Sequence, residues 1–251
     1  MSKENQPDLT RREFLSSGAK LAAGLTVAPG VLLYGAANAK PADQPVTSAV
    51  RWGMLIDTNK CSSGCNDCVE ACKKEQGWGD LEHNSAPTQQ TQYIRKVDLR
   101  NRHTGESHSL PMMCQHCETA PCADVCPTGA SFRRADGIVL VDRHICIGCR
   151  YCMMACPYKA RSFVHEELEG QLPWNPRGKG CVEACNMCVD RVDAGKIPAC
   201  AEACGEAGNG AILFGDLNDP NSEISKRLAK YASTEIRADL NLNTGIRYQG
   251  I

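Results

Sequence analysis

The sequence predicts an α+β fold of short strands and short helices, and three observations carry this prediction. The 251-residue chain has 17 cysteines, and sixteen of them fall into four motifs of four. Aromatic residues make up 5% of the chain, so its core needs another source of stability, such as bound metal. Between the second and third motifs, two β-rich runs flank Asp136-Gly137, which is a strong hairpin signal.

The two central motifs have the spacing of bacterial ferredoxin cluster loops. The third motif ends in proline and consists of Cys146, Cys149, Cys152, Cys156 and Pro157. Its first three cysteines let a tight loop wrap one face of an iron–sulfur cubane, and the fourth points to the other cluster of a pair. The second motif is of the same kind and consists of Cys114, Cys117, Cys122, Cys126 and Pro127. Joined by the hairpin, the two motifs predict one two-cluster ferredoxin unit.

The first and fourth motifs are variants of this pattern. The first has a widened first gap and consists of Cys61, Cys65, Cys68 and Cys72. Gly64 lies in that gap, where the absence of a side chain lets the backbone approach sulfur closely. The fourth motif consists of Cys185, Cys188, Cys200 and Cys204, and Cys181 is left over.

Residues 1–39 are predicted to be an export signal. The twin arginine Arg11-Arg12 precedes an apolar run over 21–37, and Ala37-Asn38-Ala39 is an A-x-A cleavage site. The alternative is an uncleaved membrane anchor, but glycines and a proline interrupt the run. The twin-arginine route carries folded cargo, which suits thiols that must meet iron before they reach an oxidising compartment. No later segment reaches the roughly 18 apolar residues of a spanning helix.

The other predicted elements are short. Strands are expected over 52–56, 93–99, 160–165 and 211–214, with a turn at 103–105. The polar segments 76–91 and 166–180 are expected to be loops, the second of them inserted. Pro198-Ala199 opens a short helix, and residues 219–222 cap a helix that runs to about residue 232. The tail to residue 251 is polar and weakly patterned.

Three chemistries compete for the cysteines. Disulfides suit an exported chain, but repeated C-x2-C pairs and an odd total are a poor disulfide framework. Zinc uses C-x2-C knuckles, yet here a fourth cysteine follows at x3 and proline follows it in two motifs. Four [4Fe–4S] clusters fit best, because the spacing recurs four times. Covalent haem c is not supported, because no C-x-x-C-H occurs.

The remaining residues indicate no catalytic site. The net charge of −1 does not favour nucleic-acid binding, and neither a triad nor a phosphate loop is present in the sequence. His116 lies inside the second motif, where it tunes hydrogen bonding near sulfur or sits at the surface. The three tryptophans are expected to be packing residues and not electron relays.

These motifs resemble the four-cluster ferredoxin subunits of membrane-associated oxidoreductases. This is the family of NrfC and of the electron-transfer subunits of polysulfide and dimethyl sulfoxide reductases. The resemblance covers about 52–232 and includes CPTGA at 126–130, CPYKAR at 156–161 and FGDLNDPNS at 214–222. The export signal, RWGMLIDTNKC at 51–61 and the widened CSSGC look most like the DsrO group, the periplasmic iron–sulfur subunits of DsrMKJOP complexes of dissimilatory sulfur metabolism.

The resemblance implies two pseudo-symmetric bacterial-ferredoxin-like units with exchanged ligands. Residues 52–72 with 181–215 would form one unit, 110–165 the other, and 216–251 a C-terminal helix and tail, all within a domain over 40–251. The implied ligand sets are Cys61, Cys65, Cys68 and Cys204; Cys185, Cys188, Cys200 and Cys72; Cys114, Cys117, Cys122 and Cys156; and Cys146, Cys149, Cys152 and Cys126. Gly205 stands where the family has proline, and Cys181 is placed to compete with Cys185.

The implied function is electron transfer without substrate turnover. The chain would relay single electrons through four [4Fe–4S] clusters at the outer face of the cytoplasmic membrane, in the periplasm. Its implied neighbours are a quinone-interacting membrane subunit of the NrfD type (DsrP-like) and a periplasmic multihaem cytochrome (DsrJ-like). The alternatives are the same relay in a molybdopterin reductase, such as polysulfide reductase, and a structural zinc or disulfide protein.

Overall fold

The computed structural model describes residues 45–79, 82–207 and 209–251. The predicted export signal over 1–39 lies outside these residues. Short helices alternate with short strands throughout the described chain, which confirms the α+β class. Among the described residues, no helix combines the length and the apolar character needed to cross a membrane.

The central sheet joins the start of the described chain to its end, with the strand order β8-β1-β9. Strand β1 (Trp52–Asp57) pairs antiparallel with β8 (Ile212–Asp216) and parallel with β9 (Ile246–Gln249). The middle residues of β1 are buried, because a central strand with both faces covered needs a continuous apolar run. A side chain at Gly53 would meet the Gly245 carbonyl at 2.5 Å, so glycine allows the close approach of β1 to the C-terminal segment.

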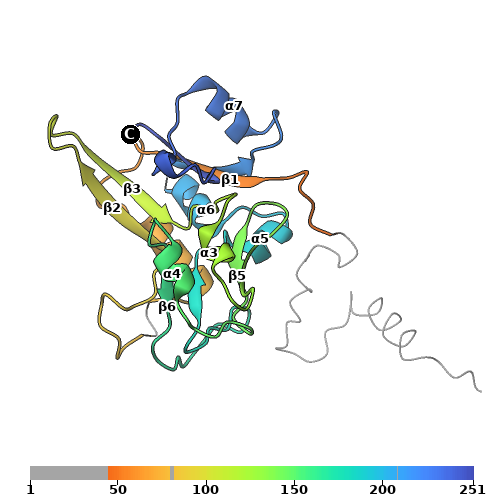
Figure 1. The fold of residues 1–251 in the computed structure, drawn as a ribbon. Coiled ribbons are helices and arrows are strands. Elements are labelled where there is room, and N and C mark those ends of the chain that lie inside the picture. The colour runs from red at the N-terminus through yellow and green to blue at the C-terminus, as the bar shows by residue number, and fades with distance from the viewer. Residues whose placement is uncertain (1–44, 80–81, 208) are drawn as a thin grey trace, which may run out of the picture. The chain divides into compact units, whose positions relative to one another are not determined.

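The tail is part of this sheet, which corrects its description as weakly patterned. In Figure 1 the orange strand β1 lies beside the blue C-terminal segment and helix α7 (Glu223–Lys230). Ser222 caps α7 as predicted, because its hydroxyl accepts a hydrogen bond from the Ser225 amide at 3.2 Å. After the 3₁₀ turn η1 (Ala238–Leu240), β9 buries Tyr248, whose hydroxyl donates to the Pro111 carbonyl at 3.2 Å.

Three antiparallel hairpins complete the sheets: β2 (Ile94–Arg100) with β3 (Ser107–Met113), β4 (Ser131–Arg133) with β5 (Val139–Val141), and β6 (Arg161–Phe163) with β7 (Val182–Ala184). The hairpin around Asp136-Gly137 is confirmed, and Gly137 has the positive φ of 90° that its turn requires. Strands β3 and β7 were not predicted, because their sequences, SHSLPMM and VEA, carry little alternation of apolar and polar residues.

Five short helices follow the cysteine loops or carry cysteines themselves: α2 (Asp67–Gln76), α3 (Pro121–Asp124), α4 (Tyr151–Ala155), α5 (Val189–Asp193) and α6 (Ala199–Glu206). Helix α2 packs against α6, and α3 packs against α4. Pro121 opens α3, and Pro198 precedes α6 as predicted. The two helix pairs bring cysteines from distant motifs together.

The predicted loops at 76–91 and 166–180 meet around a buried ion triad. The Arg177 guanidinium contacts Glu82 at 2.7 Å and Glu183 at 2.9 Å. All three side chains are at most 1% exposed. The inserted loop is therefore anchored to β7 by charge–charge contacts.

Candidate metal centres

The structure gathers the sixteen motif cysteines into four groups. Site 1 is Cys61, Cys65, Cys68 and Cys204; site 2 is Cys114, Cys117, Cys122 and Cys156; site 3 is Cys126, Cys146, Cys149 and Cys152. Each of these groups lines a hollow of about 300 Å³. Site 4 is Cys72, Cys185, Cys188 and Cys200, whose thiols are all buried and act on one another's pKa values. No disulfide joins any of the 17 cysteines, all of which lie in the described chain.

Site 1 is formed where the first motif meets α6. The Cys61 thiol lies 2.8 Å from the Lys96 ammonium on β2, and the Cys65 sulfur accepts from the Asn209 amide at 3.5 Å. The backbone N–H of Ala211 donates to the Cys204 sulfur at 3.2 Å. Donors therefore surround the sulfur atoms, as expected where sulfur carries negative charge.

Site 2 contains buried donors that have no protein acceptor in the described chain. Tyr158 and Arg161 line its hollow, and the Tyr158 hydroxyl and the Arg161 Nε and Nη1 atoms are buried without a partner. His116 is buried beside Cys117, and burial lowers its pKa to about 3, so its imidazole is neutral. Its Nδ1 accepts from the Val139 amide at 3.0 Å, which places the ring proton on the unpartnered Nε2. Such donors fit a bound group that presents acceptor atoms, such as inorganic sulfide.

Site 3 is the most open of the four. Cys149 is exposed, Cys126 and Cys146 are half-buried, and Cys152 is buried on α4. The Ser131 amide donates to the Cys126 sulfur at 3.3 Å. The loop that carries Cys149 also places Ile147 at the hollow.

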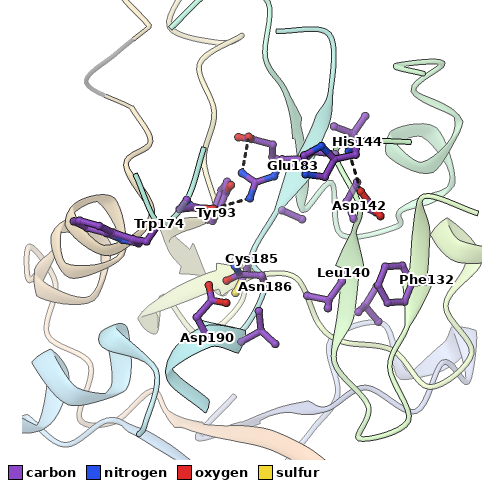
Figure 2. A pocket seen from close by; sticks show the side chains of 17 residues that line it. Tyr93, Phe132, Leu140, Asp142, His144, Trp174, Glu183, Cys185, Asn186 and Asp190 are labelled. Carbon is purple, nitrogen blue, oxygen red and sulfur yellow. Dashed lines mark hydrogen bonds and ion pairs between the residues drawn. The ribbon is translucent and has the colours of Figure 1, made fainter. Parts of the chain in front are cut away.

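Site 4 is fully buried between α2, α5 and α6. The Trp78 indole N–H donates to the Cys72 sulfur at 3.3 Å, and the Gln76 amide approaches Cys188 at 3.6 Å. Trp78 is thus more than the packing residue that the sequence predicts, because its indole contacts a candidate ligand. A larger cavity of about 970 Å³ reaches Cys185 from outside, with Trp174 and Tyr93 on one side and Leu140 and Phe132 on the other (Figure 2).

Burial raises the pKa of most of these thiols. The pKa values of Cys68, Cys114 and Cys117 rise to about 12, chiefly through desolvation. Burial also raises those of Cys72, Cys185 and Cys200 well above the ordinary value. Such thiols ionise at neutral pH only when a positive centre takes the thiolate as a ligand, so the donor sets fit metal binding.

The thiols surround space and do not converge on a point. Within residues 45–79, 82–207 and 209–251, no three His, Cys, Asp or Glu side chains are close enough together to hold a single metal ion. Zinc needs its sulfur ligands at about 2.3 Å from one centre. Four thiols around a hollow instead suit a group with several metal atoms, each of which meets a different thiolate.

Cys181 belongs with site 3 and not with site 4, to which the sequence assigned it as a competitor of Cys185. Its thiol donates to the Arg143 carbonyl at 3.3 Å. Burial and the neighbouring Cys146 raise its pKa. Strand β7 separates Cys181 from Cys185, which explains why adjacency along the chain was misleading.

Two cations near sulfur could not have been identified from local sequence. Lys96 lies on a predicted strand, but only the β2–β3 pairing and the position of the first motif bring it to Cys61. Arg161 follows the third motif and was expected to offset cluster charge, yet its sulfur contact is with Cys122 of the second motif. Neither contact has a spacing signal, because each joins segments that are far apart in the chain.

Comparison with known proteins places these sites in context. Residues 106–216 match the family described as a 4Fe-4S dicluster domain. The chain is 38% identical over 267 residues to the Hdr-like menaquinol oxidoreductase iron-sulfur subunit 1 of Archaeoglobus fulgidus, covering 96% of this chain and 97% of the relative. It is 34% identical over 224 residues to a tetrathionate reductase subunit of Salmonella typhimurium, with 89% and 80% covered. It is also 38% identical over 226 residues to protein NrfC of Escherichia coli, with 87% and 85% covered.

Proposed function

Because the chain belongs to the family of iron–sulfur oxidoreductase subunits that contain a 4Fe-4S dicluster domain, we propose that it is an electron-transfer subunit with four [4Fe–4S] clusters, one in each thiol site. Bound clusters would supply one-electron carriers that need no substrate pocket. The four cysteine groups, their hollows and the unpartnered donors at site 2 support this assignment.

The observation that carries the proposal is the order of the sites. Site 1 adjoins site 4, because Cys68 is among the charges around Cys200. Site 4 adjoins site 2, because Cys114 acts on Cys185. Site 2 adjoins site 3, because Cys122 acts on Cys152. The sites therefore form a row in the order 1, 4, 2, 3.

Burial along the row matches a conductor with two contacts. The inner sites 4 and 2 have seven buried thiols and one half-buried thiol, whereas sites 1 and 3 include half-buried and exposed ones. A buried interior excludes water and other reactants from the middle of the row, while its ends stay accessible to partners. This pattern distinguishes a relay from a set of structural metal sites, which has no need of exposed ends.

Site 3 carries the features of a contact with a protein partner. We call the side chains of Ile145, Ile147, Tyr151 and Met154 the site 3 surface. All four are exposed, with Ile147 at 67% and Met154 at 83%. They lie on the loop and helix that also carry the exposed Cys149. Large apolar side chains around an exposed ligand suit a subunit that covers them and brings its own redox centre to Cys149.

The finer proposal is a periplasmic subunit of a complex of dissimilatory sulfur metabolism, as in the DsrO group. The partners are a quinone-interacting membrane subunit of the NrfD type (DsrP-like) and a periplasmic multihaem cytochrome (DsrJ-like). The relative named as a menaquinol oxidoreductase subunit supports contact with a quinone-linked complex. Arg11-Arg12 supports export and a place at the outer face of the cytoplasmic membrane.

A second candidate is the same relay in a molybdopterin reductase, such as polysulfide reductase. The relatives named as tetrathionate reductase and dimethyl sulfoxide reductase subunits favour it. Purification of the native complex separates the two proposals, because one predicts a molybdopterin subunit and the other a multihaem cytochrome.

The test uses the tagged full-length chain in its native host. In detergent extracts, the wild-type protein should co-migrate with an NrfD-type subunit, and quinol should reduce its clusters. The double variant Ile147→Glu, Met154→Glu should lose this partner while it retains its iron. Leu99→Glu is the matched control, since Leu99 is also exposed but lies on β2. A wild-type protein that runs as a free monomer and exchanges electrons with soluble carriers at full rate would contradict the subunit assignment.

A further inference from the structure

Arg161 is a buried cation whose hydrogen-bond donors are only partly used. It is the first residue of β6, and 6% of it is exposed. Its Nη2 donates to the Cys122 sulfur at 3.0 Å and to the Ser131 hydroxyl at 2.8 Å. Its Nε and Nη1 are buried without a partner among the described residues. A guanidinium in this state needs anions nearby, because burial of an unpaired charge is costly.

The anions around Arg161 come from two sites. Arg161 lines the hollow of site 2, and Ser131, which it contacts, lines the hollow of site 3. Burial works to lower the pKa of the guanidinium, but Cys122, Cys114 and Cys152 oppose it and leave that pKa raised. Within the described chain, no carboxylate forms an ion pair with Arg161. Its charge is therefore shared between the sulfur atoms of sites 2 and 3.

We propose that Arg161 is a positioning residue shared by two clusters, and that it raises the reduction potentials of the clusters in sites 2 and 3 together. Reduction adds negative charge to a cluster, and a fixed positive charge beside both sites stabilises that reduced state. Hydrogen bonds to cluster sulfur act in the same direction. The unpartnered Nε and Nη1 supply donors for sulfur atoms that the thiols alone do not provide.

Arginine suits this position better than lysine does. The planar guanidinium directs donors to several sides at once, whereas an ammonium is a compact point charge. Lys96 shows the contrast at the other end of the row, where its ammonium contacts Cys61 of site 1. The fold thus contains one cation that serves a single site and one that serves two.

This inference rests on the proposed four-cluster relay, and its test separates the two claims. Full-length holoprotein is prepared anaerobically as wild type, Arg161→Gln, Arg161→Lys and Lys96→Gln. Iron and acid-labile sulfide are measured first, and the midpoint potentials are then titrated with detection by electron paramagnetic resonance. A wild-type protein without four clusters contradicts the proposed function, whereas four clusters with the wrong pattern of shifts contradict this inference alone.

In Arg161→Gln, two potentials should move to more negative values and two should stay. In Lys96→Gln, one different potential should move. Arg161→Lys should restore one of the two potentials more than the other, because one ammonium cannot reach both sites. Unchanged potentials, or a shift in one cluster alone, in Arg161→Gln with full iron content would overturn the proposal. If Arg161→Gln loses iron, Arg161→Lys decides: a negative shift at site 2 or 3 supports the shared role, and two unchanged potentials overturn it.

Discussion

At the scale of single residues, N–H groups surround the candidate ligands, and each contact has a measurable consequence. Trp78 donates to Cys72 at 3.3 Å and also stacks on Tyr93. The substitution Trp78→Phe keeps an aromatic ring but removes the N–H. We expect the potential of the site 4 cluster to become more negative, because its thiolate loses a hydrogen bond. Potentiometric titration measures this shift, and Trp52→Phe, which alters a stack on Phe214, is the control.

A second expectation at this scale concerns the seventeenth cysteine. Cys181 donates to a backbone carbonyl and lies outside the four lined sites, so Cys181→Ser should leave the iron content unchanged. Cys185→Ser should lose or convert one cluster, because Cys185 belongs to buried site 4. Iron analysis of the two purified variants checks this. Loss of iron in Cys181→Ser with full iron in Cys185→Ser would show that the fourth ligand set is wrong.

At the scale of elements, the inserted loop is held by the triad of Arg177, Glu82 and Glu183. Arg177→Met should lower the free energy of unfolding by about 3–5 kcal/mol, because it leaves two buried carboxylates without their partner. Lys179→Met is the control, since its pair with Glu167 is exposed and contributes little. Denaturant titration of the anaerobic holoprotein, followed by circular dichroism, measures both variants. Equal midpoints for the two variants would contradict an anchoring role.

The C-terminal strand offers another test of an element. Tyr248→Ala should lower the free energy of unfolding by about 3–5 kcal/mol, because the side chain is fully buried against the central sheet. Tyr248→Phe removes only the hydroxyl that bonds Pro111 and Gln115, and it should cost about 0.5–1.5 kcal/mol. The same denaturant titration compares them. A neutral Tyr248→Ala would mean that β9 does not contribute to the folded core.

The elements also show what sequence reasoning reached. The hairpin at Asp136-Gly137 and the cap at Ser222 were predictable, because each depends on local turn chemistry. Strands β3, β7 and β9 were not, because their pairing partners alone stabilise them. The cysteine grouping was available only through family resemblance, since the sequence cannot show that α2 packs on α6. Lys96 and the second role of Arg161 depend on that tertiary packing and were found only in the structure.

At the scale of the whole molecule, the cysteines take the place of a larger apolar core. Nine motif cysteines are buried in the same cluster of side chains as Met54, Ile56 and Tyr248. Their raised pKa values mean that the apoprotein buries neutral thiols around hollows, which metal must fill to complete the packing. Cluster ligation by these sixteen cysteines stays a prediction until the bound metal is measured.

The most direct test of the account is therefore the iron and acid-labile sulfide content of the mature protein, purified anaerobically and compared with its protein concentration. Four cubane clusters predict about sixteen iron and about sixteen sulfide per chain. They also predict broad absorbance near 400 nm (roughly the thiolate-to-iron charge-transfer region) that dithionite bleaches. A protein that saturates with about eight iron, or that binds zinc in place of iron and sulfide, would contradict the four-site relay.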